Sequence, residues 1–192
     1  MKFQYITDRL ILQVLDEMAA PLVLQFYQTN KDAFDQWEPK RPDTFYTTRY
    51  QRSVLQAEKK LFFSSSSVRY YLFEKTSPDK IIGSICFYQI LNSPYCSCNL
   101  GYKIDASHQH KGYALEALKT LIPEVFHTLR LYRIQADIMP TNSASIRLIT
   151  RLGFTQEGLM RGSYEICGTR TDHIRYALLA DDHPNQTTSN LF

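Results

Sequence analysis

The feature that most constrains this chain is a glycine-containing turn between a predicted strand and a long amphipathic helix. The strand-like segment 98–104 comes first, and the turn follows and ends at Gly112. Beyond it, apolar side chains recur at three- and four-residue intervals, at Leu115, Leu118, Ile122, Val125 and Leu129. This spacing predicts a helix with one buried face that begins just after Gly112. Strands that alternate with such helices are typical of the α/β class.

The remaining pattern predicts further helices and strands. Helices are expected at 20–29, at about 48–62, and after Asn142 or Ser143, where an N-cap residue precedes a helix that Gly153 ends. Strands are expected at 10–14, 70–74, 81–91, 98–104, 133–139, 154–164 and 171–179. We place turns at 77–79 and 92–94 and a hairpin near Gly168. Two prolines exclude a regular element from segment 37–42.

Length and composition limit the class of protein. The 192 residues are 44% hydrophobic and 21% charged, close to the average for globular proteins. We expect one domain at 1–180 and a polar tail at 181–192. No apolar run is long enough to span a bilayer, and the first residues do not resemble a secretory signal. A cytoplasmic protein without membrane contact is therefore expected.

Charge and cysteine spacing predict neither a nucleic-acid partner nor a metal. The net charge is only +3, and no run of Lys or Arg exceeds two, so direct nucleic-acid binding is not expected. Cys86, Cys96, Cys98 and Cys167 have no C-x-x-C spacing and no nearby Cys/His pair. We expect four reduced, buried thiols and no metal site.

The turn before the helix has the chemistry of an anion site. The first N–H groups of a helix lack partners within it and lie at the positive end of its dipole. Gly112 allows the main chain to approach an anion closely, and Lys111 adds a positive charge. One glycine before a helix also occurs in ordinary tight turns, so a purely structural role is the alternative.

Three motifs in this order resemble the GNAT N-acetyltransferase superfamily. They are Gln-x-x-Gly-x-Ala at 109–114, Asn-x-x-Ser at 142–145 and Leu-Gly-Phe at 152–154, and the likeness covers about residues 5–180. The resemblance implies a twisted, mostly antiparallel mixed sheet with helices on both faces. It also implies a splayed pair of strands that receives acetyl-CoA.

The resemblance assigns roles to the residues of these motifs. The pyrophosphate of acetyl-CoA would lie on the turn formed by Gln109, His110, Lys111, Gly112, Tyr113 and Ala114. The backbone from Tyr102 to Ile104 would line the gap for pantetheine. Asn142 would contact the pantetheine arm, and Ser145 would face the same site. As helix residues alone, Asn142 and Ser145 are more often ordinary caps.

The sequence is still closer to the ribosomal-protein-alanine N-acetyltransferase branch. Segments 7–10, 37–39, 100–102, 133–134, 139–140, 151–154 and 168–172 read like that branch, and Trp37-Glu38-Pro39 is the most specific of them. The branch implies a substrate that is the N-terminal α-amine of a ribosomal protein. An acetyltransferase for small amines and a non-catalytic acetyl-CoA-binding module are the alternatives.

The chemistry requires little catalytic assistance. A free α-ammonium has a pKa of about 7.7 to 8.0, so modest help from a base produces the neutral amine. Many GNAT enzymes have a tyrosine acid seven residues after the asparagine, where this chain has Ile149. Because the branch that this chain resembles commonly has serine at position 145, Ser145 becomes the candidate acid. Asp137 is the candidate base, or an exposed strand carboxylate with no role. Glu38 is a candidate to hold the substrate ammonium, or a solvated loop residue.

Overall fold

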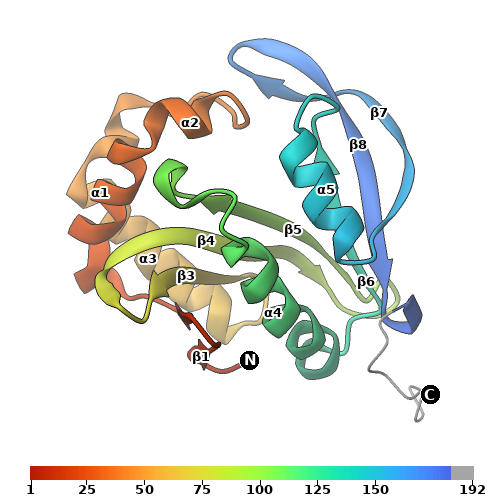
Figure 1. The fold of residues 1–192 in the computed structure, drawn as a ribbon, viewed down its shortest axis with the longest axis horizontal. Helices are drawn as coiled ribbons and strands as arrows, with labels where there is room; N and C mark the ends of the chain where they lie inside the picture. The colour runs from red at the N-terminus through yellow and green to blue at the C-terminus, as the bar shows by residue number, and fades with distance from the viewer. Residues whose placement is uncertain (183–192) are drawn as a thin grey trace.

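The computed structural model describes residues 1–182, where eight strands form one sheet in the order β1-β2-β3-β4-β5-β6-β8-β7 (Figure 1). All neighbouring strands are antiparallel except β5 and β6, which are parallel. The strands are β1 (Gln4–Ile6), β2 (Leu10–Gln13), β3 (Val68–Glu74), β4 (Ser77–Leu91), β5 (Ser97–Ile104), β6 (Arg133–Ile138), β7 (Thr155–Ile166) and β8 (Thr169–Leu179). The expected mixed, mostly antiparallel sheet is confirmed.

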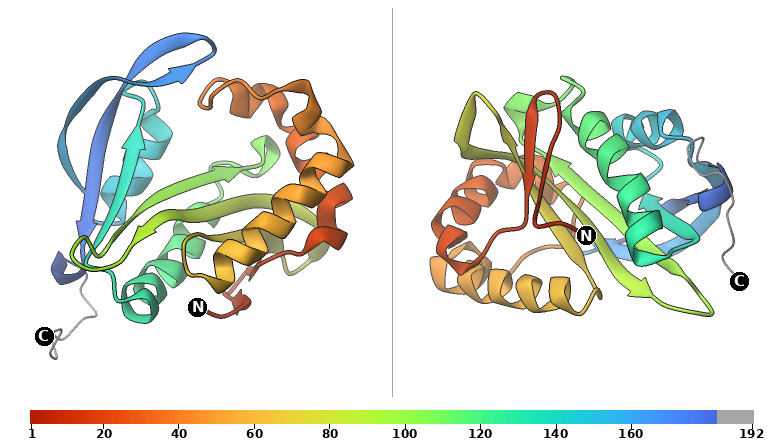
Figure 2. Two further views of the ribbon diagram at one scale, coloured as in Figure 1. Left: turned by 180° about the vertical axis from the view of Figure 1, so that it is seen from behind. Right: turned by 90° about the horizontal axis from the view of Figure 1, so that it is seen from below.

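Helices cover both faces of this sheet, as expected (Figure 2). On one face lie α1 (Ala20–Thr29), α2 (Lys31–Asp35) and α3 (Thr48–Phe63), and on the other lie α4 (Tyr113–Leu129) and α5 (Ser143–Arg151). Each layer has its own core. Tyr71, Phe73 and Ile81 of the sheet pack with the first group, whereas α4 and α5 pack on a larger cluster that includes Leu100 and Ile134.

The strands β5 and β6 diverge after a short stretch of pairing. They pair only where Ser97 to Asn99 lie beside Arg133 to Gln135. Beyond this point β5 continues to Ile104 beside β4, and β6 continues to Ile138 beside β8. Within the described residues no strand fills the gap, so one backbone edge of the second half of β5 has no strand beside it.

The two helices that flank this gap begin as predicted. Gly112 is the N-cap of α4 and has a φ of +81°, a left-handed conformation that glycine adopts without strain. Asn142 is the N-cap of α5, and its side chain accepts a hydrogen bond from the Ser145 N–H at 3.1 Å. Gly153 follows α5 with a φ of +90°.

The sequence analysis did not predict two short elements, and it misplaced one turn. Neither β1 nor α2 was predicted, because three and five residues are too few to display a period. The turn expected at 77–79 lies instead at Lys75-Thr76, and β4 already starts at Ser77. Pro78 falls within a register shift between β3 and β4, where no regular ladder bond is needed from its nitrogen.

The expectations for the thiols and the tail need correction. All four cysteines are free, but only Cys86 and Cys98 are buried, and Cys167 is exposed at the β7–β8 turn. Residues 181 and 182, expected to be tail, belong to a short 3-10 helix, Ala180–Asp182, whereas 183–192 lie outside the described residues. Within residues 1–182, no helix is both long and apolar enough to cross a membrane.

Candidate active site

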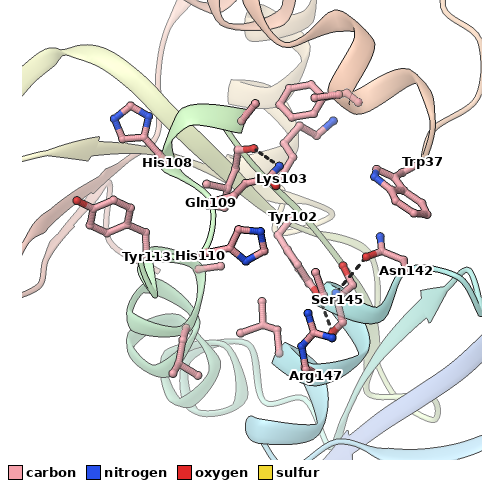
Figure 3. A pocket seen from close by; sticks show the side chains of 18 of the residues that line it. Trp37, Tyr102, Lys103, His108, Gln109, His110, Tyr113, Asn142, Ser145 and Arg147 are labelled. Atoms are coloured by element: carbon pink, nitrogen blue, oxygen red, sulfur yellow. Dashed lines mark hydrogen bonds between the residues drawn. The ribbon is translucent and has the colours of Figure 1, made fainter.

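A cavity of about 680 Å³ lies where β5 and β6 diverge (Figure 3). Its walls are the turn before α4, the second half of β5, the pocket-facing side of α5 and the segment from α2 to Glu38. Side chains from both faces of the sheet line it, because Tyr102 and Ile104 point toward α4 and α5 while Lys103 points toward α1 and α2. The volume lies within the range of small-molecule sites, about 300 to 1,000 Å³.

The turn before α4 and the first turn of that helix line this cavity. His110 and Gly112 both have left-handed backbones, with φ of +61° and +81°, and Gly112 to Leu115 all line the cavity. The first N–H groups of α4 have no partner within the helix, so they are available to an anion. The predicted residues Gln109, His110, Gly112, Tyr113 and Ala114 are therefore brought together here. Lys111 is exposed and does not line the cavity.

Arg9, from the β1–β2 hairpin, supports this turn from outside. Its Nε donates to Glu116 Oε2 at 2.6 Å, and its Nη1 donates to the Lys111 carbonyl at 3.0 Å. The guanidinium also lies 4.5 Å from the ring centroid of Tyr113, whose hydroxyl bonds to Glu74. Burial alone would raise the pKa of Glu116, but bonds from Thr7 and Arg9 lower it, so the carboxylate stays ionised.

A second network holds the segment that leads into the turn. Asp105 is 2% exposed, and its carboxylate lies 2.9 Å from Asn30 Nδ2 and 2.7 Å from His108 Nδ1. Burial acts to raise the pKa of Asp105, but hydrogen bonds from Ser107, His108 and Asn30 hold it well below its ordinary value. His108 is thereby fixed at the cavity wall.

Tyr102 joins β5 to α5 across the gap. Its hydroxyl donates to the Ser145 carbonyl at 3.3 Å, and burial raises the pKa of Tyr102 to about 12. Tyr102, Ile104, Asn142 and Ser145 all line the cavity. Among the described residues, nothing bonds to the Ser145 hydroxyl, so it is available to a ligand. Asn142 serves as a helix cap and also faces the cavity, so its role as a cap does not exclude a contact with a ligand.

Trp37 and Glu38, from the segment after α2, also line the cavity, and in Figure 3 Trp37 lies directly above Asn142. Glu38 is neither solvated nor free, since Lys103 bonds to one of its oxygens and Arg41 to the other. Burial acts to raise the pKa of Glu38, but the two cations outweigh it and lower the pKa. Glu38 is therefore a carboxylate with two cationic partners before any substrate amine arrives.

Asp137 does not line the cavity. As expected it lies on the opposite face of β6 from the buried Ala136 and Ile138. Both of its oxygens accept hydrogen bonds, from Arg175 at 2.9 and 3.0 Å and from the Tyr164 hydroxyl at 2.9 Å. Its side chain is only 7% exposed, which excludes the alternative of a solvated carboxylate.

The hairpin of β7 and β8 meets α2 beyond this group. At its tip the Cys167 thiol lies 3.1 Å from the backbone carbonyl of Asp35, across 132 residues of sequence. A thiol is a weak donor, so this contact fixes position more than it adds stability. It links the two sides of the molecule on either side of the gap.

Sequence reasoning missed several cavity residues, among them Lys103, His108, Arg147 and Arg151. The signal for the arginines was present, because positions 147 and 151 share a helix face with Ala144 and Leu148. The alternation of β5 similarly separates Lys103 from Tyr102 and Ile104. Nothing in the sequence points to the contacts of Asp105, whose partner Asn30 is 75 residues away.

Comparison with known proteins decides the family. Residues 9–155 match the family model described as an acetyltransferase (GNAT) domain. The chain belongs to the GNAT acetyltransferase family. It is an N-acetyltransferase, and GNAT enzymes take the acetyl group from acetyl-CoA. The predicted fold, family and reaction class are thereby confirmed.

Individual GNAT relatives cover most of the chain. It is 32% identical over 153 residues to the probable N-acetyltransferase YjcK of Bacillus subtilis, covering 80% of this chain and 84% of the relative. It is 30% identical over 182 residues to the [ribosomal protein uS5]-alanine N-acetyltransferase of Escherichia coli, covering 94% and 93%. The solved ribosomal-protein-S5-alanine acetyltransferase of Vibrio fischeri is 25% identical and superposes with a TM-score of 0.89 over 94% of this chain and 98% of that one.

Proposed function

We propose that this chain transfers the acetyl group of acetyl-CoA to the N-terminal α-amine of a ribosomal protein. The observation that carries the proposal is that the cavity at the gap is lined from both faces of the sheet. A donor held against α4 and α5 can thus meet an acceptor that comes from the α1 and α2 side. The similarity to the Escherichia coli enzyme favours a protein N-terminus as that acceptor.

The residues of the cavity fit acetyl-CoA as donor. The backbone N–H groups at Gly112 to Leu115 suit its pyrophosphate, and the unpaired edge of β5 suits the amide groups of pantetheine. Asn142 and Ser145 flank the gap on the side of α5. We assign the predicted cofactor residues to these places, with Lys111 contributing its backbone and its charge at the rim.

The transfer forms a C–N bond to the amine and breaks the C–S bond of the thioester. The amine loses one proton, and the departing thiolate gains one. We propose that the Ser145 hydroxyl donates this proton and regains one through water from the proton that the amine releases, because the hydroxyl lines the cavity and has no partner among the described residues. Ile149, at the position of the usual tyrosine acid, is fully buried and has no proton to give.

Removal of the amine proton requires only a weak base. Asp137 stays our candidate and would act through water, since it does not line the cavity and both its oxygens are already bonded. Burial and the Asp137 carboxylate raise the pKa of Tyr164 to about 12, so the tyrosine remains a donor to Asp137. A contact of Glu38 with the substrate ammonium would add a third cation to its two present partners.

A substrate panel tests the proposal. Purified enzyme and acetyl-CoA are incubated with a peptide that begins with alanine, with the same peptide blocked at its N-terminus but carrying an internal lysine, and with a polyamine and an amino sugar. Mass spectrometry should find one acetyl group, on the α-amine of the first peptide. Acetylation of only the small amines would overturn the protein acceptor. Comparison of ribosomal-protein N-termini from cells with and without the enzyme would identify the target.

A further inference from the structure

Arg147 and Arg151 are two cations in the cavity that the acetyl transfer does not use. Both are exposed, both line the cavity, and neither has an ion pair or hydrogen bond among the described residues. Four residues apart on α5, they lie on one face of the helix, where like charges disfavour each other. A ligand that brings negative charge to this wall would relieve that repulsion.

The cavity contains little to neutralise them. Glu38 is the only carboxylate that lines it within residues 1–182, and Glu38 is already paired with Lys103 and Arg41. In Figure 3, Arg147 and His110 approach the cavity from opposite sides, one from α5 and one from the turn. The wall of α5 is therefore a second positive region, separate from the helix N-terminus at Gly112.

The position of the arginines along α5 indicates which part of a ligand they would meet. Asn142 and Ser145, at the start of α5, flank the gap between the strands. Arg151, nine residues after Asn142, lies roughly 13 Å farther along the helix axis at 1.5 Å per residue. A ligand whose reactive end is at the gap and which runs along α5 would thus meet Arg147 first and Arg151 with its far end.

We propose that Arg147 and Arg151 form a subsite for the 3′-phosphate on the ribose of coenzyme A. This inference rests on the proposed function, which places the pyrophosphate at Gly112 to Leu115 and the pantetheine arm at the gap. A phosphate is the group that the planar guanidinium binds best, through paired N–H donors. The subsite would make the enzyme select coenzyme A over its analogue without the 3′-phosphate.

Binding of coenzyme A and of 3′-dephospho-coenzyme A, measured by calorimetry, tests the subsite. The native protein should bind coenzyme A about tenfold to a hundredfold more tightly, the range for charged hydrogen bonds. Arg147→Gln and Arg151→Gln should each reduce this preference and leave the affinity for the dephospho analogue unchanged. The matched control is Arg52→Gln, an exposed arginine of α3 that does not line the cavity.

The outcomes separate this inference from the proposed function. If the native protein binds both compounds equally, or if the arginine variants weaken both equally, the 3′-phosphate subsite is overturned while the acetyl-CoA site stands. If the native protein binds neither compound, the proposed function itself fails. Arg151→Lys should retain part of the preference, because the charge remains while the paired donors are lost. Higher salt should reduce the preference of the native protein.

Discussion

Arg9 and Glu116, 107 residues apart in sequence, meet at 2.6 Å on the outer side of the turn before α4. Because Arg9 also bonds to the Lys111 carbonyl, the pair fixes the turn in the shape that exposes its N–H groups. We expect Arg9→Gln to weaken acetyl-CoA binding about threefold to tenfold, the effect of roughly 1 kcal/mol. Glu116→Gln should act alike, and the double variant should lose little more than either. Calorimetry that found full affinity in Arg9→Gln would refute this role.

Gly112 tests the anion site directly. A side chain there would meet only Arg9, 3.6 Å from the added Cβ, so the φ of +81° and not lack of space is what excludes other residues. Gly112→Val should abolish the rise in melting temperature that acetyl-CoA causes in the native protein. Gly158→Val is the control, because a Cβ at this strand position meets nothing within 4 Å. An unchanged rise in Gly112→Val would end the assignment of the turn.

Ser145→Ala separates a catalytic role from a structural one. The Ser145 backbone N–H, not its hydroxyl, bonds to Asn142, so the substitution keeps the helix cap. We expect kcat to fall about a hundredfold, as for loss of a general acid, with acetyl-CoA affinity nearly unchanged. Steady-state kinetics and a binding titration on the same preparation measure both. A parallel loss of affinity would mean that Ser145 only binds the cofactor.

We expect the Glu38 carboxylate to contribute to the stability of the folded protein. Glu38→Gln leaves Lys103, whose side chain is 12% exposed, without its carboxylate, and should lower the free energy of unfolding by about 1.5 to 3 kcal/mol. The double variant Glu38→Gln/Lys103→Met should recover part of this loss. Urea denaturation measures all three proteins. Equal stability of Glu38→Gln and the native protein would contradict the ion pair.

The predicted contact of Glu38 with the substrate ammonium has its own kinetic signature. If the carboxylate holds the amine, Glu38→Gln should raise the KM for peptide about tenfold to a hundredfold without changing the KM for acetyl-CoA. Equal changes in both constants would instead follow from the displaced Lys103, which lines the same cavity.

The network around Asp105 predicts how stability depends on pH. Because the pKa of Asp105 is lower in the folded state than its unfolded value of about 3.9, the carboxylate stabilises the fold fully above that pH. The contribution is lost as the pH falls through the folded value. The difference in unfolding free energy between the native protein and Asp105→Asn should be constant from about pH 5 to 7 and shrink below about pH 4. A difference that grew toward low pH would contradict the network.

Local signals in the sequence were sufficient for much of this structure. The period of α4, the glycine before it and the asparagine cap of α5 act over a few residues, so they could be read directly. The short elements β1 and α2 could not, because burial against the rest of the chain and not a pattern of their own determines them. Pro78 was misleading, since it occupies an irregular stretch of pairing instead of a turn.

The residues of the site also fall into those that a local motif marks and those that come from distant segments. Motifs mark the residues of the turn, Asn142 and Ser145, and all of them except Lys111 line one cavity in the structure. The groups that hold them in place come from distant segments, as Arg9 does for the turn and Lys103 for Glu38. Such pairs form only when the sheet brings separate strands together, and no spacing along the chain encodes them.

The contact between Cys167 and Asp35 has a consequence for the geometry of the gap. The two halves of the sheet separate after Asn99 and Gln135, and the weak contact at the hairpin tip joins the two sides of the gap again at its far end. The gap is therefore bounded by strand pairing at one end and by the Cys167 contact at the other. A ligand therefore binds in a gap that exists before it arrives, so little of its binding energy is needed to order the two halves of the sheet.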